Sequence, residues 1–423
     1  MHRQRVIDMN PNDPDDPTEL QIEIFENRDI DTLVCDSLTN EDSNMAKILY
    51  YFFSEKYNIG EDDNWYMFQN HIWHKIGRVN NELMLEGVKK IKDLYGILLY
   101  HCEQNGIDMT KIRQIRHIMN GIGKARKIRD VMETAQTIFS VENNPEGDFV
   151  SRLDMNRHLI GFNNGIFDLK YNEFRDGRVD DYVTMTVGYD YVPHHTHMYE
   201  GLERFIEDIQ PNRDERDYML TYLSRALYKN VDELFTIMVG HGQNGKSELI
   251  GLIEQTFGDY YGTLSNKLFT RRQRNASQPD QELLDARYKK IIIAHESERR
   301  EKLNGCFVGF ISRTDSVAIR ARHSNKMVEF RPQFITLFAC DDIPRIDLNT
   351  ERARRRLRCI NFPTEFCDNP QLPHQRKMDI DISEHIGEWK QDFMLLLLGC
   401  YKRYVENRIM IPVGNVLMWA NRY

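Results

Sequence analysis

The spacing of apolar residues divides the chain into a mainly helical first part and a later part in which strands and helices alternate. From about residue 44 to residue 141, apolar residues recur at helical intervals, as in MAKILYYFFSEKY and VKKIKDLYGILLYHCEQ. Inside this region, the segment NWYMFQNHIWHKI places Trp65 and Trp73 in a strand-like setting. It predicts a small hairpin in which both tryptophans are core residues.

The pattern changes to alternation around His158–Lys170. There the dipeptide Asn164-Gly165 stands between two apolar runs, and Asn-Gly is a strong signal for the turn of a hairpin. The segment DDYVTMTVGYDYVP continues the β-like alternation to about residue 193. We therefore expect a small β element here, before helical spacing returns in YEGLERFIEDI and RDYMLTYLSRALYK.

From Leu234 onward, strand-like apolar runs alternate with helical patterns. The runs are LFTIMV, KKIIIAHESE, QFITLFACDDIP and the end of RARRRLRCINF. This order predicts an α/β domain with a central, largely parallel sheet. After Phe362, the segment EHIGEWKQDFMLLLLGCYKRYVEN predicts a helical coda.

Together these patterns divide the chain into four expected segments. They are an acidic, proline-bearing tail or linker at 1–40, a helical domain with a small β element at 41–200, an α/β domain at 201–365 and a helical segment at 366–423. The chain ends at Tyr423 without an obvious terminating signal, so we expect it to be a fragment of a longer protein.

Composition narrows the class of protein. The chain has 423 residues, of which 29% are charged and 41% hydrophobic, as in ordinary globular proteins. The apolar run FMLLLLG is too short to cross a bilayer, and the polar, acidic start does not read as a signal peptide. The seven cysteines form no CxxC pair, which indicates reduced thiols, a cytoplasmic location and no zinc site.

The net charge of −9 does not indicate nucleic-acid binding, but it does not exclude it. A ring-shaped motor needs positive charge only where a strand passes. Basic residues cluster at 271–274, 313–326 and 352–358, so any nucleic-acid contact is expected to be local.

The stretch GHGQNGKS (Gly240–Ser247) carries the clearest chemistry. It follows the apolar run LFTIMV and opens the helical pattern SELIGLIEQTF, which is the order that a phosphate-binding loop needs. Its three glycines let the backbone turn with N–H groups directed at an anion, and the helix N-terminus adds partial positive charge. Lys246 is placed to reach the β- and γ-phosphates, and Ser247 to bind Mg²⁺. The loop predicts binding of a nucleoside triphosphate.

Acidic residues end the second predicted strand, at Glu296 and Glu298. A carboxylate at a strand tip beside a phosphate loop can hold Mg²⁺ and polarise the attacking water. We choose Glu296 for this role, with Glu298 as second candidate. A solvated acidic turn is the alternative.

Three further elements follow in the sequence. Val317–Pro332 reads as a hairpin with a basic tip suited to gripping the phosphates of a single strand, although a solvated charged loop is an equal alternative. The next strand ends at Asp341 and Asp342, where a polar residue is placed to sense the γ-phosphate. The arginine-rich run Arg352–Phe362 suits an arginine acting at a neighbouring subunit, or a phosphate- or partner-binding patch.

This order of elements resembles the superfamily 3 helicases of viruses and phages. It is most similar to the helicase part of the primase-helicases of poxviruses and other large DNA viruses. That group typically has NGKS in its phosphate loop, as at Asn244–Ser247, and an Asn-Gly-hydrophobic-x-Asp-Leu signature, as at Asn164–Leu169. The paired tryptophans of NWYMFQNHIW also resemble the group's helical leader domain. The resemblance spans roughly residues 60 to 420.

The resemblance implies a collar at 41–200, an AAA+-like P-loop ATPase domain at 201–365, and a role for individual residues. Lys246, Glu296 and Arg356 would be catalytic, the last two as Walker B acid and arginine finger. ATP and Mg²⁺ would be the cofactors, with Ser247 and Glu296 holding the metal. The expected nucleotide-binding residues are Gly240, Gly242, Asn244, Gly245, Lys246, Ser247 and Asp341, and the expected DNA-binding residues are Arg320, Arg322, His323 and Lys326.

Two positions depart from the pattern of that group. The lysine that precedes the family's hairpin falls at Gly309, with only Asp315 retained and Arg313 as a possible substitute. The sensor asparagine falls at Asp341, and an ionised carboxylate accepts hydrogen bonds but donates none. These departures bear on coupling to movement more than on ATP binding.

The leading hypothesis is an ATP-dependent DNA helicase of viral or phage replication, working as a ring, by analogy a hexamer, on single-stranded or forked DNA. A primase domain or protein and other replication factors are expected partners, and no membrane is. The alternative is an ATP-switched scaffold that loads on DNA without unwinding it. A small-molecule P-loop kinase would explain the loop but neither the hairpin nor the arginine cluster.

Overall fold

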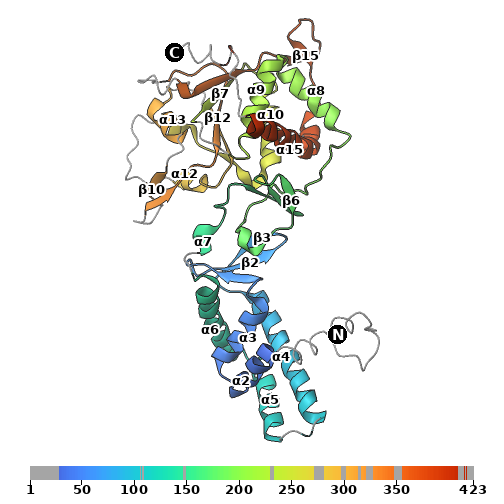
Figure 1. Cartoon of the computed structure of the whole chain (residues 1–423). Helices are drawn as coiled ribbons and strands as arrows, with labels where there is room; N and C mark the ends of the chain where they lie inside the picture. Colours follow the sequence, from blue (N-terminus) through green and yellow to red (C-terminus); the bar gives the residue numbers. More distant parts are fainter. Residues whose placement is uncertain are drawn as a thin grey trace. The chain divides into compact units, whose positions relative to one another are not determined.

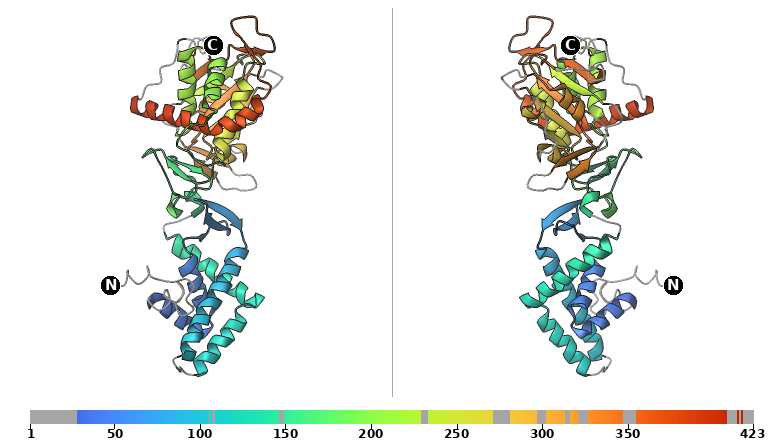
Figure 2. Two further views of the ribbon diagram at one scale, coloured as in Figure 1. Left: turned by 90° about the vertical axis from the view of Figure 1, so that its right-hand side faces the viewer. Right: turned by 90° about the vertical axis from the view of Figure 1, so that its left-hand side faces the viewer.

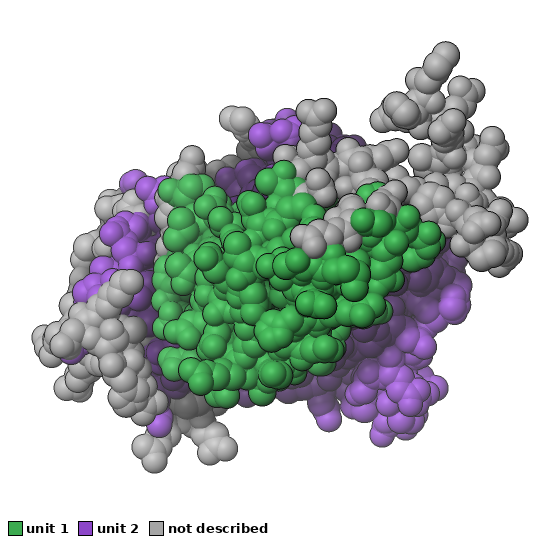
Figure 3. Space-filling model, turned by 90° about the horizontal axis from the view of Figure 1, so that it is seen from below, with its two compact units in different colours: residues 1–69, 73–153 green, residues 70–72, 154–423 purple. Residues whose placement is uncertain are grey.

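The chain folds into two compact units, which we describe separately (Figure 1; Figure 3). Our computed structural model describes residues 28–104, 106, 109–145, 149–228, 233–270, 281–296, 302–312, 316–320, 327–346, 355–407, 414 and 416. Unit 1 comprises residues 1–69 and 73–153, and unit 2 comprises residues 70–72 and 154–423. The division falls before the border that we expected at residue 200, so the β element at 158–175 belongs with the later unit.

Unit 1 is mainly helical, as the apolar spacing predicted. Its core gathers the apolar faces of its helices, including Ile30 and Val34 of α2. A tail was expected at 1–40, but residues 28–39 are helical. The rest of that segment, residues 1–27, lies outside the described residues. The elements are α2 (Arg28–Asp36), η3 (Ser37–Thr39), α3 (Asp42–Phe53), β1 (Tyr57–Ile59), β2 (Trp65–Gln69), β3 (Ile72–Gly77), α4 (Asn81–Gln104), α5 (Met109–Gly121), α6 (Ala125–Asn143) and α7 (Phe149–Arg152).

The small hairpin predicted from NWYMFQNHIWHKI is confirmed as β2 and β3. Asn70 and His71 connect the strands with φ angles of 50° and 70°, the left-handed conformation that a two-residue hairpin turn favours. Trp65 and Trp73 are 2% and 3% exposed, so both are core residues. Trp65 packs edge-on against Phe139.

Unit 2 is built on a five-stranded sheet in which every neighbouring pair of strands is parallel. The predicted parallel sheet is therefore confirmed. Its order is β13-β7-β12-β9-β8, so the first strand along the chain lies between the fourth and the fifth. The strands are β7 (Phe235–Val239), β8 (Tyr261–Thr263), β9 (Ile291–His295), β12 (Ile335–Cys340) and β13 (Leu357–Asn361).

Side chains of this sheet feed a separate core on each face, because neighbouring residues of a strand point to opposite sides. In β9, Ile291 and Ile293 join one core, and Ile292 and Ala294 join the other. The first face is covered by α8 (Tyr199–Ile209), α9 (Arg213–Ser224), α10 (Lys246–Phe257) and α15 (Ile382–Asn407). The second is covered by α11 (Asn266–Thr270), α12 (Gln281–Asp285) and α13 (Gly305–Ile311). Figure 2 shows α15, the predicted helical coda, as one long red helix, which packs along α10 and α9.

Unit 2 also contains the hairpin predicted around Asn164-Gly165, but its turn lies one residue earlier than predicted. β4 (Leu159–Phe162) pairs with β5 (Gly165–Asp168) so that Phe162 faces Gly165, and the turn is therefore Asn163-Asn164. Gly165 is needed for another reason, since a Cβ atom there would collide with the Phe174 ring of β6 (Glu173–Arg175). The residues after β6 run without regular strand structure to residue 193, contrary to the β-like pattern.

Two short strand pairs complete the unit. β10 (Val317–Arg320) and β11 (Met327–Phe330) are antiparallel, with Arg320 opposite Met327, so the strands of the predicted hairpin are confirmed. β14 (Glu365–Cys367) and β15 (Gln375–Lys377) are parallel. All seven cysteines are free thiols. Among the described helices, none has the length and apolar character required to span a membrane.

Candidate functional site

The glycine loop between β7 and α10 turns sharply, and two of its three glycines are sterically required. A Cβ atom on Gly240 would collide with the side-chain amide of Asn244. At Gly245, φ is +77° and a Cβ atom would collide with Cγ2 of Ile209. Gly242 differs, because a Cβ atom there meets no other atom within 4 Å. The loop therefore depends on Gly240 and Gly245 for its shape.

Two hydrogen bonds fix the second half of the loop. The Phe366 amide donates to the Gln243 carbonyl at 2.7 Å, and the Lys246 amide donates to Oδ1 of Asn244 at 3.2 Å. Asn244 is only 5% exposed. Helix α10 begins at Lys246 directly after Gly245, so its first amides lie beside the loop, where an anion is favoured.

Lys246 lies over the loop with its ammonium group held by neutral acceptors. Its Nζ donates to the carbonyl oxygens of Gly240 at 2.8 Å and Cys340 at 2.6 Å. The Asp341 carboxylate is 3.4 Å away, and that side chain is 68% exposed. This positive charge is thus positioned at the loop by main-chain groups rather than by a close, buried carboxylate.

The carboxyl ends of three neighbouring strands bring the predicted acids to the same edge of the sheet. Val239 of β7 pairs with Cys340 of β12, so Gly240 and Asp341 follow in register. The Glu296 amide donates to the Ala339 carbonyl at 2.8 Å, which places Glu296 beside the same edge. Ligands of parallel α/β sheets bind at this edge, where the strand order reverses.

Electrostatic effects at this edge agree with the placement. Burial and the negative charge of Glu296 raise the pKa of the Cys340 thiol. Desolvation and the nearby Lys246 charge lower the pKa of His295, although part of its ring stays open to solvent. His295 is therefore neutral at neutral pH, so the positive charge at the loop comes from Lys246.

The residues at the loop fit a hard divalent cation such as Mg²⁺. Magnesium prefers oxygen ligands and keeps several waters. The Ser247 hydroxyl is exposed at the start of α10, and the Glu296 carboxylate follows β9 at the same edge of the sheet. Within the described ranges, no group of three or more His, Cys, Asp or Glu residues forms a complete protein-only metal site.

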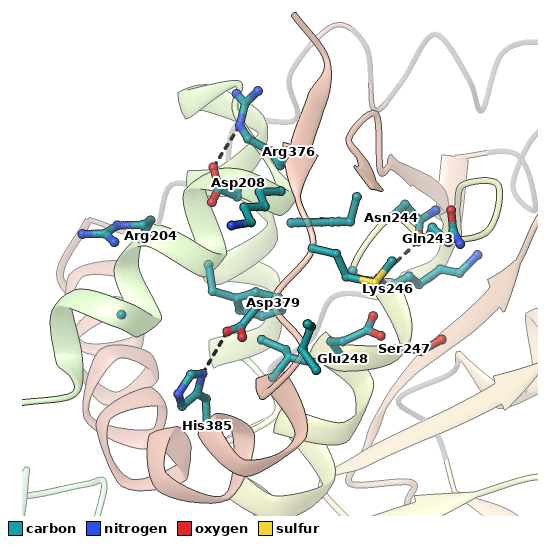
Figure 4. Close-up of a pocket in the computed structure, with 18 of the residues that line it drawn as sticks. Arg204, Asp208, Gln243, Asn244, Lys246, Ser247, Glu248, Arg376, Asp379 and His385 are labelled. Atoms are coloured by element: carbon teal, nitrogen blue, oxygen red, sulfur yellow. Dashed lines mark hydrogen bonds and ion pairs between the residues drawn. The ribbon is translucent and has the colours of Figure 1, made fainter. Parts of the chain in front are cut away.

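A cavity of about 1240 Å³ opens beside the loop (Figure 4). The loop and the start of α10 form one wall, and α8 forms the opposite wall. Residues 376–389, from β15 to the first turns of α15, close the remaining side. Its apolar surface comes from Met198, Phe205, Phe366, Met378, Ile380, Ile382 and Trp389.

Polar pairs brace the walls of this cavity. Nε of Arg376 donates to Asp208 at 3.0 Å, and Nδ1 of His385 lies 2.9 Å from Asp379, as Figure 4 shows. Arg204 of α8 also lines the cavity. None of these residues was predicted from the sequence, because α8 and residues 376–389 are distant from the loop along the chain and carry no local motif.

Comparison with known proteins identifies relatives. Residues 46–211 match the family described as D5 N terminal like. A protein named "Putative helicase" from Acanthamoeba polyphaga mimivirus is 27% identical over 412 residues, which cover 90% of this chain and 42% of that protein. A protein named "Putative primase" from African swine fever virus (strain Badajoz 1971 Vero-adapted) is 24% identical over 372 residues, which cover 79% of this chain and 37% of that protein.

The chain is a distant homologue of the D5-like viral primase-helicases. It spans about two fifths of the length of the two relatives. Among solved structures, the apo C terminal region of NrS-1 matches over 51% of this chain and 49% of that chain, with 16% identity and a TM-score of 0.36.

The remaining predicted site residues lie on other elements than the loop or outside the described residues. Arg356 precedes β13 at the amino edge of the sheet and is 8% exposed. Its guanidinium donates to the Gly309 carbonyl at 2.9 Å and forms a close ion pair with Glu233. Arg320 ends β10. Outside the described residues lie Arg322, His323 and Lys326 of the hairpin tip, with Glu298, Arg313 and Asp315.

Proposed function

We propose that this chain is the motor part of an ATP-dependent DNA helicase of superfamily 3, with an AAA+-like P-loop domain. The observation that carries the proposal is the glycine loop, whose Lys246 ammonium and α10 N-terminus lie at the sheet edge that also holds Glu296. This arrangement matches the requirements of a triphosphate site. The distant homology to proteins named as putative helicases and primases supports the choice of reaction.

In this proposal, residues of the chain supply binding and orientation. Lys246 exchanges its bonds to the Gly240 and Cys340 carbonyls for bonds to phosphate oxygens, which the loop amides and the α10 N-terminus also bind. Ser247 and Glu296 would hold Mg²⁺, which neutralises phosphate charge when it is bound. Glu296 also orients and polarises the attacking water.

The cavity beside the loop supplies a place for the nucleoside. Its apolar residues suit the faces of a base, and pockets for small ligands are usually apolar with a few polar groups.

The remaining parts of the motor come from assembly. We propose a homo-hexameric ring in which Arg356 completes the nucleotide site of a neighbouring subunit, as an arginine finger does. The hairpin carrying Arg320, Arg322, His323 and Lys326 would grip a single strand in the pore. Unit 1 would act as the collar, and a primase domain or protein would work with the motor.

A test of the proposal compares the wild-type chain with Lys246→Ala. We expect wild type to hydrolyse ATP, to do so faster with single-stranded DNA, and to separate a forked duplex. The variant should neither hydrolyse ATP nor separate the duplex. ATP turnover by the variant at the wild-type rate would contradict the assignment of the site. Turnover by a wild-type monomer that DNA does not stimulate would instead favour a small-molecule kinase.

A specific observation supports a second candidate function, an ATP-switched scaffold that loads on DNA. Asp341 stands where the resemblance to superfamily 3 helicases implies a sensor asparagine, and it lies 3.4 Å from Lys246. A carboxylate there repels the γ-phosphate, which would slow turnover. Slow hydrolysis with DNA-dependent assembly and no strand separation would decide for the scaffold.

A further inference from the structure

The corner between α5 and α6 in unit 1 is strongly basic, although the whole chain carries a net charge of −9. Residues 109–129 contain no Asp or Glu. Their seven Lys and Arg residues are Lys111, Arg113, Arg116, Lys124, Arg126, Lys127 and Arg129. This concentration is local, because acidic residues reappear at Asp130 and Glu133 further along α6.

The fold places most of these charges on the outside. The apolar face of α5 is buried through Ile112, Ile115 and Ile118, so Arg113 and Arg116 are exposed between these positions. Helix α6 likewise buries Val131, Ala135 and Phe139, and exposes Arg126 and Arg129 in its first turns. The exposed basic residues of α5 and α6 therefore precede and follow one short connection in the sequence.

The connection itself adds charge. Only residues 122–124 separate the two helices, and Lys124 is exposed there. Nζ of Lys92, from α4, lies 3.5 Å from the place where a Cβ atom on Gly123 would be. The ammonium group of a residue from a third helix therefore lies at this connection.

Carboxylates of the unit neutralise only part of this charge. Arg116 pairs with Glu103 at 2.8 Å, and Lys127 pairs with Asp42 at 2.7 Å. Arg126 is 92% exposed and its nearest approach to Asp130 is 4.0 Å. Within the described part of the chain, no carboxylate forms an ion pair with Arg113, Lys124 or Arg129. Their charges are therefore left to solvent or to a bound anion.

We infer that the α5–α6 corner binds the phosphate backbone of nucleic acid, at a site separate from both the glycine loop and the predicted hairpin. Regularly spaced phosphates are the chemical complement of several exposed, flexible cations. Such contacts fix position without reading sequence. The corner thus adds a nucleic-acid contact to unit 1 that does not depend on nucleotide turnover.

The test removes the three unpaired charges in Arg113→Ala/Lys124→Ala/Arg129→Ala. The matched control, Lys47→Ala/Arg78→Ala/Lys402→Ala, removes three exposed charges elsewhere. Binding of fluorescent single-stranded and duplex DNA is measured across a salt series without nucleotide. We expect the slope of log K against log salt to fall by about 2 for single strands or about 3 for duplex in the corner variant only. The strand type with the larger loss identifies the preferred form.

Two further variants distinguish loss of DNA contacts from a folding defect and from failure of the nucleotide site. The exchange Arg113→Lys/Lys124→Arg/Arg129→Lys retains the charges and should retain the wild-type slope, which guards against a folding defect. Lys246→Ala should bind DNA at the corner as wild type does, so failure of the nucleotide site and failure of the corner are distinguishable. A corner variant with the wild-type affinity and slope for both DNA forms would overturn the inference.

Discussion

Lys246 and Arg356 are both 8% exposed, yet they lie at opposite edges of the central sheet and have different partners. Lys246 follows the carboxyl end of β7 and donates to two main-chain carbonyls. Arg356 precedes the amino end of β13, and its partner Glu233 precedes the amino end of β7. A cation held by neutral carbonyls can exchange them for a phosphate, whereas a cation paired with a partly buried carboxylate must leave an opposite charge behind.

This contrast indicates which edge of the sheet would change on assembly. At the carboxyl edge, the proposed ligand replaces weaker acceptors, so a single chain can bind it. At the amino edge, an arginine that serves a neighbour must first separate from Glu233, and removing one partner of a buried pair costs about 3–5 kcal/mol. We therefore predict that contact with the neighbour supplies a replacement for that ion pair.

The largest effect is expected at the carboxyl edge, from Lys246→Ala. Loss of this charge should lower the ATP turnover number by at least about 100-fold, because one well-placed electrostatic group contributes on that scale. Thermal unfolding should change little, since the closest acceptors of the side chain are two main-chain carbonyls and the Asp341 carboxylate, at 3.4 Å, is largely exposed. A variant that unfolds readily would show that Lys246 serves the fold, and the contrast with Arg356 would disappear.

A second prediction separates the two roles of Arg356. Arg356→Ala should lose about 3–5 kcal/mol of stability and also most of the turnover of the assembled protein. Glu233→Gln should lose stability but keep turnover, because the guanidinium remains available. Urea unfolding and ATPase rates measure the two effects. Equal loss of turnover in both variants would indicate a purely structural ion pair.

The glycines provide a matched pair at the loop. Gly245→Ala forces a Cβ atom into Ile209 at φ +77° and should weaken nucleotide binding about 10-fold, or roughly 1–2 kcal/mol. Gly242→Ala should bind nearly as wild type, because its Cβ atom meets no other atom within 4 Å. Binding of a fluorescent nucleotide compares the variants, and equal affinities would show that the loop relaxes around either change.

The amino edge of the sheet holds another buried basic residue, Lys290, which should make the stability of the fold depend on pH. Lys290 precedes β9, donates to the carbonyls of Leu227 and Arg157, and has its pKa lowered to about 7 by burial and by the Arg157 charge. The unfolded chain then binds more protons between pH 7 and the ordinary lysine pKa of about 10.5, so stability should rise with pH through that window. Its slope should reach up to about 1.4 kcal/mol per pH unit, and Lys290→Met should remove it. An unchanged slope in the variant would assign the dependence to other groups.

The smallest effect is expected from Asp341→Asn, which restores a hydrogen-bond donor at the end of β12. Because the Asp341 side chain is 68% exposed, its charge is well screened, and we expect only about a two- to fivefold gain in turnover. Steady-state kinetics with single-stranded DNA measure it. A loss of turnover would mean that the carboxylate orients water rather than opposing the phosphate.

The sequence predicted elements better than it predicted their neighbours. Runs such as LFTIMV were recognised as strands because they are short, apolar and followed by a glycine turn, and β7 lies there. The order of strands in the sheet could not be predicted, because β7 pairs with β12 and β13, which are about a hundred residues away in the sequence. The turn of the β4–β5 hairpin was misplaced by one residue because Gly165 serves packing against Phe174 rather than the turn.

The candidate site shows the same limit. The residues of the glycine loop could be predicted because they form a recognisable motif within one short segment, Gly240–Ser247. The cavity walls from α8 and residues 376–389 could not, because they meet the loop only in the folded chain. The burial of Arg356 was also hidden, since Glu233 lies 123 positions earlier in the sequence.

The bond from the Phe366 amide to the Gln243 carbonyl has a practical consequence. Phe366 also lines the cavity. Its amide therefore connects two parts of the proposed site: the loop, which would bind phosphate, and the cavity wall, which would contact a base. Deuterium uptake at this single position would therefore track how often the empty pocket loosens, and slower uptake after adding a nucleotide would register occupancy without a substitution or an attached dye.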